Sequence, residues 1–114
     1  MKRGEIYYAN LGHNIGSEQS GTRPVIILQN DMGNRHAPTT IIAPLTTKNT
    51  KHKIPTHYWL DTKFANCPRD SMVLLEQVKV IDKSRLGKYI GRVSEADQKQ
   101  IDKALAISMG LVSL

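Results

Sequence analysis

The sequence predicts a small, curled, mostly antiparallel β-sheet that is completed by one C-terminal helix. The first observation behind this fold is a series of short apolar runs, of which Val25–Leu28 and Met72–Leu75 are typical. Runs of this length suit buried strands and are too short for core helices. The second observation is a change to helical spacing after Ser94. A chain of 114 residues has the length of one domain, so residues 1–114 are taken as a single domain.

Polar and glycine-containing segments divide the first four-fifths of the chain into short strands. The predicted strands are Glu5–Ala9, Pro24–Gln29, Thr39–Leu45, Thr56–Leu60, Ser71–Val80 and Tyr89–Val93. The long segment Leu11–Thr22 carries three glycines and is predicted to be a loop. The other connections are predicted to be a turn at Asn30–Asn34, a basic loop at Thr46–Pro55 and one helical turn at Asp82–Leu86.

The last segment has the signals of an amphipathic helix. Ser94 to Asp97 has the form of a capping box, in which the Ser94 hydroxyl accepts from exposed backbone N–H groups. Gly110 stands where the helix is expected to stop. Five residues then fall on one face at helical spacing, and this face is predicted to lie on the sheet: Ile101, Ala104, Leu105, Ser108 and Met109.

The charge of the chain points to a polyanionic partner. The formal net charge is +6 and the pI is about 9.6. Residues 1–94 hold fourteen basic and seven acidic side chains, whereas residues 95–114 hold two and three. No acid interrupts the basic residues between Asp31 and Asp61, or those between Asp82 and Glu95. Such stretches attract nucleic acids or acidic protein tails, although a solvated basic surface explains them as well.

The cysteine content and the N-terminus predict a cytoplasmic protein. Cys67 is the only cysteine, so an internal disulfide and a zinc ribbon are excluded. The charged residues at the N-terminus precede no apolar run, so no signal peptide is predicted. No apolar stretch has the length of a membrane span.

RNA cleavage without a metal needs a base for the 2′-hydroxyl proton, an acid for the departing 5′-oxygen and groups that stabilise the charged phosphorane. Histidines are the first candidates for this base and this acid, because the ordinary pKa of the histidine side chain lies near neutrality. His13, His36, His52 and His57 form no pair at a telling spacing. The acidic residues are scattered, which disfavours a metal nuclease, and no cofactor is expected. Composition and spacing alone therefore predict only a basic, β-rich domain that is a candidate for nucleic-acid binding.

Several motifs add a family resemblance. Residues 16–25 read G-S-E-Q-S-G-T-R-P-V, and residues 70–77 read D-S-M-V-L-L-E-Q. These segments, together with residues 29–35, 44–47, 60–61 and 81–86, resemble the MazF/PemK-like toxins over essentially the whole chain.

The resemblance implies an SH3-like barrel core and a homodimer. It also implies the toxin half of a toxin–antitoxin pair, namely a metal-independent, sequence-specific endoribonuclease that cuts single-stranded mRNA. The expected products carry a 2′,3′-cyclic phosphate and a 5′-hydroxyl. The expected partners are RNA and a cognate, acidic MazE-like antitoxin.

Arg23 and Thr46 match the functional arginine and threonine of that family. Arg23 precedes Pro24, which favours an extended backbone, and its guanidinium offers a planar fork of donors to phosphate oxygens. Thr46 is expected to position a phosphate with its hydroxyl. Glu18 is the nearest candidate for the base, and the alternative is that Glu18 pairs with Arg23 and only orients it. The residues expected to bind RNA are Ser17, Gln19, Thr47, Lys48, Lys51, Ser71 and Gln77.

Two other functions stay open at this point. CcdB-like toxins share the fold yet poison gyrase by binding a protein, so fold alone does not decide. A non-catalytic RNA-binding barrel would bind the same RNA and leave it intact. The dimer surface is expected on the outward faces of the strands near Val25–Leu28 and on the C-terminal helix.

Overall fold

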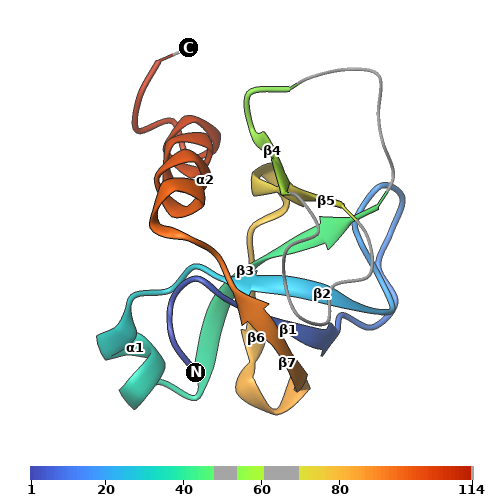
Figure 1. Ribbon diagram of the computed structural model, residues 1–114. Coiled ribbons are helices and arrows are strands. Elements are labelled where there is room, and N and C mark those ends of the chain that lie inside the picture. The colour runs from blue at the N-terminus through green and yellow to red at the C-terminus, as the bar shows by residue number, and fades with distance from the viewer. Residues whose placement is uncertain (48–53, 61–69, 114) are drawn as a thin grey trace.

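The computed structural model describes residues 1–47, 54–60 and 70–113. Within these residues the chain forms one mainly β structure with a C-terminal helix, as predicted (Figure 1). The strands are β1 (Glu5–Asn10), β2 (Thr22–Ile27), β3 (Thr39–Thr46), β4 (His57–Leu60), β5 (Ser71–Leu74), β6 (Lys79–Asp82) and β7 (Leu86–Arg92). The helices are α1 (Asp31–His36) and α2 (Glu95–Ser108), with short 3-10 turns η1 (Leu75–Gln77) and η2 (Lys83–Arg85).

The seven strands form one antiparallel sheet in the order β4-β5-β3-β2-β1-β7, with β6 also paired to β3. Strand β3 is central because one edge pairs with β2 while the other edge pairs with β6 and then with β5. Strands β4 and β7 remain the two ends of this order. The described residues therefore form an open sheet, and the expected barrel is not closed.

The predicted strand Ser71–Val80 is in fact two strands separated by η1. The interruption falls at Leu75, whose side chain is fully buried in the core. The Leu75 N–H donates to the Thr56 carbonyl at 2.9 Å, and the Leu75 carbonyl accepts from the Ser108 hydroxyl at 2.7 Å. Its backbone groups are thus used by the segment before β4 and by α2, so the β-ladder stops there.

The predicted turn at Asn30–Asn34 was wrong, because this segment begins the short helix α1. Asn30 caps that helix by accepting from the Gly33 N–H at 2.8 Å. Asn34 is buried, and its side chain donates to the Gln29 carbonyl and accepts from the Thr40 hydroxyl. This polar network makes the helical turn more favourable than an open loop.

Helix α2 begins as the sequence predicts. Ser94 is the N-cap, and its hydroxyl accepts from the Asp97 N–H at 3.1 Å. The Asp97 carboxylate accepts from the Tyr58 hydroxyl at 2.6 Å and so ties the first turn to β4. Figure 1 shows α2 standing beside β4.

The predicted apolar face of α2 is correct except at its end. Ile101 and Ala104 are buried, and Leu105 packs against the same core. Met109 is 59% exposed, contrary to the prediction, because the helix ends at Ser108. Gly110 then adopts a positive φ of 73°, as expected of a helix-terminating glycine.

The sheet has a hydrophobic cluster on each face. Alternate residues of β2 and its extension serve both clusters, with Ile26 and Leu28 on the α2 side and Val25 and Ile27 on the other. All four side chains are buried within the single chain. These four side chains are therefore not available for a dimer surface, and the expected surface on the outward faces of the strands near them and on α2 stays a prediction. Among the described residues, no helix is long and apolar enough to cross a membrane.

Candidate functional site

The segment between β1 and β2 is a loop, as predicted, and its own hydrogen bonds order it. Its base is closed by the Leu11 N–H, which donates to the Gly21 carbonyl at 2.9 Å, and by the Gly21 N–H, which donates to the Gly12 carbonyl at 2.8 Å. The Asn14 amide donates across the loop to the carbonyls of Leu11 and Gln19. Gly12 and Gly21 have positive φ values of 72° and 75°, which glycine adopts without a steric penalty.

Arg23 lies in β2 at the exit of this loop and is half-buried. Its Nε donates to the Ser20 carbonyl at 2.9 Å, and its Nη1 donates to the Gln19 side-chain oxygen. Both acceptors belong to the loop that precedes the strand. The guanidinium is therefore held against the loop, and among the described residues Nη2 makes no hydrogen bond.

Thr46 is the last residue of β3, and the register brings it near Arg23. Val25 faces Pro44 across the β2–β3 pair. Arg23 and Thr46 each lie two residues further toward the same end of the two strands. Because side chains alternate along a strand, both residues lie on the face that carries Val25 and Pro44. The structure thus brings together the two residues that the resemblance selects.

A cavity of about 280 Å³ lies beside this end of the sheet. It opens between the β1–β2 loop and the segment that runs from η1 into β6. Its lining includes the charged residues Glu18, Glu76 and Lys79 and the apolar residues Leu11 and Pro44. The remaining lining residues are Asn14, Gln19, Gln77 and Val78. Such a mixture of apolar surface and few polar groups suits a flat, hydrogen-bonding ligand.

Gln77 joins η1 to the loop with both ends of its amide. Its oxygen accepts from the Gln19 N–H at 2.8 Å, and its nitrogen donates to the Ser17 carbonyl at 3.1 Å. Sequence reasoning placed Ser17, Gln19 and Gln77 together near RNA, and the structure brings these three residues together.

Glu18 lies exposed at the cavity wall. The anticipated ion pair between Glu18 and Arg23 is not formed within the described residues, where the acceptors of Arg23 are Gln19 and Ser20. Glu18 thus remains a candidate base, and the orienting contact belongs to Gln19.

The other expected RNA-binding residues are placed less uniformly. Thr47 is exposed directly after β3. Ser71 opens β5 opposite Leu60 and is only 3% exposed, so it is not presented at the surface with the others. Lys48 and Lys51 lie outside the described residues.

His57 has a structural partner. Its Nε2 lies 2.5 Å from a carboxylate oxygen of Glu76, and its side chain is 12% exposed. Glu76 also accepts from the Thr56 hydroxyl at 3.1 Å, so this pair attaches β4 to η1. His52 lies outside the described residues, and His13 and His36 are exposed. In the part of the chain that the structure describes, no group of three or more His, Cys, Asp or Glu side chains is arranged to hold a metal ion.

Sequence reasoning missed the roles of Asn14, Glu76 and Lys79. Asn14 lies in the segment that was predicted only to be a loop, and its amide spans that loop. Glu76 and Lys79 line the cavity because η1 turns the chain between β5 and β6. A glutamate and a lysine at a predicted strand carry no separate signal in the sequence.

The chain is similar to known proteins over nearly its whole length. A family described as "PemK-like, MazF-like toxin of type II toxin-antitoxin system" matches residues 2–109. The chain is 46% identical over 112 residues to endoribonuclease EndoA of Bacillus subtilis (strain 168), with 98% of this chain and 97% of that protein covered.

Solved structures agree with the sequence match. An endoribonuclease solved in complex with its cognate antitoxin, from Mycobacterial species, has a TM-score of 0.81 and 30% identity over 100% of this chain and 99% of that one. MazF (Form-I) from Deinococcus radiodurans has a TM-score of 0.82 and covers 96% of each chain, and at 19% identity it shows the shared fold alone. Fold and matches together define a small toxin of the endoribonuclease class. The chain belongs to the PemK-like, MazF-like family of type II toxin–antitoxin systems.

Proposed function

We infer that this protein cuts single-stranded mRNA at a short sequence, without a metal ion, and leaves a 2′,3′-cyclic phosphate and a 5′-hydroxyl. The observation that carries this proposal is the Arg23 guanidinium, held by loop acceptors at the same end and on the same face of the sheet as Thr46. An arginine in this setting offers its remaining N–H donors to a phosphate.

The chemistry is an intramolecular transesterification. The 2′-oxygen attacks the adjacent phosphorus while its proton passes to a base. The bond from phosphorus to the 5′-oxygen breaks, and that oxygen takes up a proton. The additional charge gathers on the non-bridging oxygens of the phosphorane, where preorganised donors have their largest effect on the rate.

Each candidate residue suits one of these tasks. Arg23 stabilises the phosphorane, because a guanidinium stays protonated at neutral pH and is a poor base. Its second possible task is proton donation to the 5′-oxygen. Thr46 positions a phosphate oxygen with its hydroxyl. Glu18, exposed at the cavity wall, is the candidate that accepts the 2′-proton.

The cavity and its rim would hold the bases around the cut. Single-stranded RNA is recognised through unstacked bases, whose edges bind polar side chains. Gln19 lines the cavity and Ser17 adjoins it, and these two residues are proposed to supply such groups. Gln77 also lines the cavity, and both ends of its amide are bonded to the loop. Thr47, Ser71, Lys48 and Lys51 remain predicted RNA contacts, and loop residues set the preferred sequence.

The proposal includes regulation by an acidic antitoxin and action as a homodimer in the cytoplasm, where mRNA is found. Support for an antitoxin comes from the Mycobacterial neighbour, which was solved with its cognate antitoxin. An acidic, disordered peptide presents carboxylates where RNA presents phosphates, and it orders on binding.

The test is cleavage of a long mixed single-stranded RNA in excess EDTA, followed by sequencing of the new 5′ ends and analysis of the 3′ termini. Cleavage that survives chelation and yields 2′,3′-cyclic phosphates is the expected result. Activity that disappears in EDTA and returns with magnesium contradicts the proposed mechanism. RNA that is bound but intact supports a non-catalytic barrel, and intact RNA with inhibited gyrase supports a CcdB-like poison.

A further inference from the structure

We propose that Gln77 is a positioning residue for Arg23 and acts on it through Gln19. This proposal rests on the proposed function, because it assigns Arg23 to the cleavage site. It extends that function to a residue whose side chain holds the loop that in turn holds the guanidinium.

The first step is the contact between Gln77 and the loop. The Gln77 oxygen accepts from the Gln19 N–H at 2.8 Å, while the Gln77 nitrogen donates to the Ser17 carbonyl at 3.1 Å. Both partners are backbone groups, whose donor and acceptor roles are fixed. Among the described residues, these are the hydrogen bonds that reach the tip of the loop from outside the β1–β2 hairpin.

The second step leads from the loop to Arg23. The side chain of Gln19 accepts from Arg23 Nη1, and the neighbouring Ser20 carbonyl accepts from Arg23 Nε. The backbone at Gln19 is therefore fixed by Gln77, and the side chain of the same residue orients the guanidinium. If the loop tip moves, the acceptor of Nη1 moves with it.

The third step is the rigidity of the 3-10 turn η1, to which Gln77 belongs. Leu75, in the same 3-10 turn, is fully buried and bonded through its backbone to Thr56 and Ser108. Glu76 pairs with His57 at 2.5 Å. The turn η1 is thus attached to β4 and α2, while the loop opposite it is attached to η1 through Gln77. A side chain fixed in this way can hold a reacting group in place, and small misplacements are costly for the chemical step.

A direct contact between Gln77 and RNA is the competing explanation, and the two differ in what they change. A residue that acts through Arg23 lowers kcat and leaves KM nearly unchanged, whereas loss of an RNA contact weakens binding. A residue that acts through Arg23 also has nothing left to affect once Arg23 is removed.

The experiment compares Gln77→Leu with Gln98→Leu, which removes another hydrogen-bonded glutamine, one that donates to Asp102 at 2.8 Å. The first readout is the Arg23 side-chain Nε–H signal in nitrogen-15 NMR spectra of the RNA-free protein, assigned by its absence from Arg23→Ala. Gln77→Leu is expected to shift this signal and speed its exchange with solvent, and Gln98→Leu is expected to leave it unchanged. If Gln77→Leu does not fold, Gln77→Asn, which is too short to span both partners, takes its place.

The second readout is single-turnover cleavage. We expect Gln77→Leu to lower the rate at saturating enzyme by about tenfold to a hundredfold. In an Arg23→Ala background the same change should have almost no further effect. An unaltered Arg23 signal, or an equal loss of rate in both backgrounds, overturns the proposal. If the wild-type protein does not cut RNA at all, the proposed function fails, while the NMR comparison still decides whether Gln77 positions Arg23.

Discussion

Arg23 and Thr46 lie on the same face and at the same end of the neighbouring strands β2 and β3, two residues beyond the facing pair Val25 and Pro44. Strand pairing thus brings together two residues that are far apart in the sequence. The relationship leads to predictions for catalysis, for partner binding and for the scaffold that supports the site.

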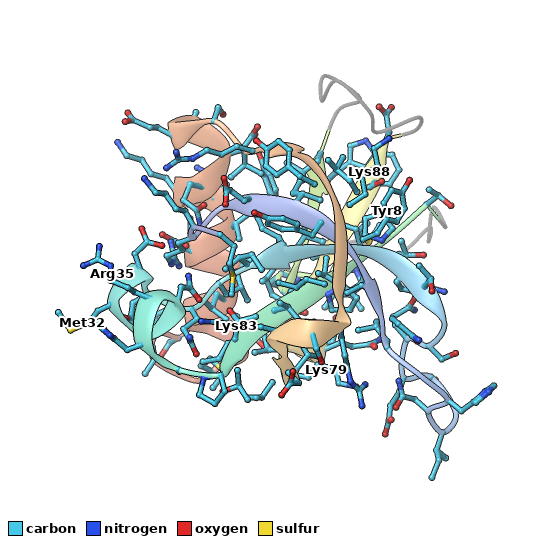
Figure 2. The ribbon with its side chains drawn as sticks, turned by 90° about the horizontal axis from the view of Figure 1, so that it is seen from below. Tyr8, Met32, Arg35, Lys79, Lys83 and Lys88 are labelled. Atoms are coloured by element: carbon cyan, nitrogen blue, oxygen red, sulfur yellow. The ribbon has the colours of Figure 1, made fainter. Side chains whose placement is uncertain are left out.

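Replacing Arg23 with alanine should lower the cleavage rate by about two to three orders of magnitude, the usual scale for losing one preorganised charge-stabilising donor. The fold should survive, because the guanidinium is held by loop acceptors and does not belong to either hydrophobic cluster. The measurement is single-turnover cleavage together with a circular dichroism spectrum. Arg35→Ala is the control, since Figure 2 shows Arg35 projecting outward from α1. A folded Arg23→Ala protein with the wild-type rate would remove Arg23 from the site.

An acidic antitoxin peptide should compete with RNA for the same surface. We expect a cognate peptide to displace catalytically inactive toxin from fluorescent RNA, and we expect displacement to weaken as salt rises. For RNA binding alone, the logarithm of the binding constant plotted against the logarithm of the salt concentration should have a slope of about −3, as expected for roughly four phosphate contacts. Fluorescence anisotropy measures both. Simultaneous binding of peptide and RNA, with neither affinity changed, would show that the two do not share a groove.

Loss of the α2 cap should destabilise the protein measurably. The Ser94 hydroxyl accepts from the Asp97 N–H at 3.1 Å, and Ser94→Ala leaves that donor without this partner. We expect a loss of about 1 kcal/mol in the free energy of unfolding, measured by urea denaturation. Ser94→Gly is the matched variant. It should lower the free energy of unfolding by only about a few tenths of a kcal/mol, because glycine also suits the N-cap position. An unchanged free energy of unfolding in Ser94→Ala would argue against a stabilising role of this hydrogen bond.

The phenol of Tyr7 should make the protein sensitive to high pH. Burial raises the pKa of Tyr7 to about 12 from an ordinary value of 10.0, and the hydrogen bond to Glu5 adds to this effect. Since the folded state holds the proton more tightly, the contribution to stability is complete below pH 10.0 and is lost as the pH rises toward about 12.

Ultraviolet absorbance of tyrosinate should show a titration step near pH 12 that is missing from Tyr7→Phe. The free energy of unfolding, measured by urea denaturation across the same pH window, should fall less steeply with pH for Tyr7→Phe than for the wild type. Identical titration curves for the two proteins would rule out this assignment.

Local sequence patterns were sufficient for the class of fold and for most element positions. Short apolar runs with polar breaks marked the strands, since alternation and length are properties of the chain itself. Ser94 and Gly110 marked the ends of α2, because capping depends on residues close together in sequence. The motif around Arg23 and the position of Thr46 could likewise be read from local residues and from the family resemblance.

Tertiary structure decided what depends on residues that are distant in sequence. The break at Leu75 arises because Thr56 and Ser108 use its backbone groups, and neither partner is visible in the local pattern. The burial of Val25–Leu28 on both faces follows from the helix on one side and the second cluster on the other. The contact of Gln77 with Gln19 spans 58 positions, and it exists only because η1 faces the loop across the cavity. Sequence alone therefore selected the candidate residues for the chemistry, whereas long-range packing decided which side chains hold them in place.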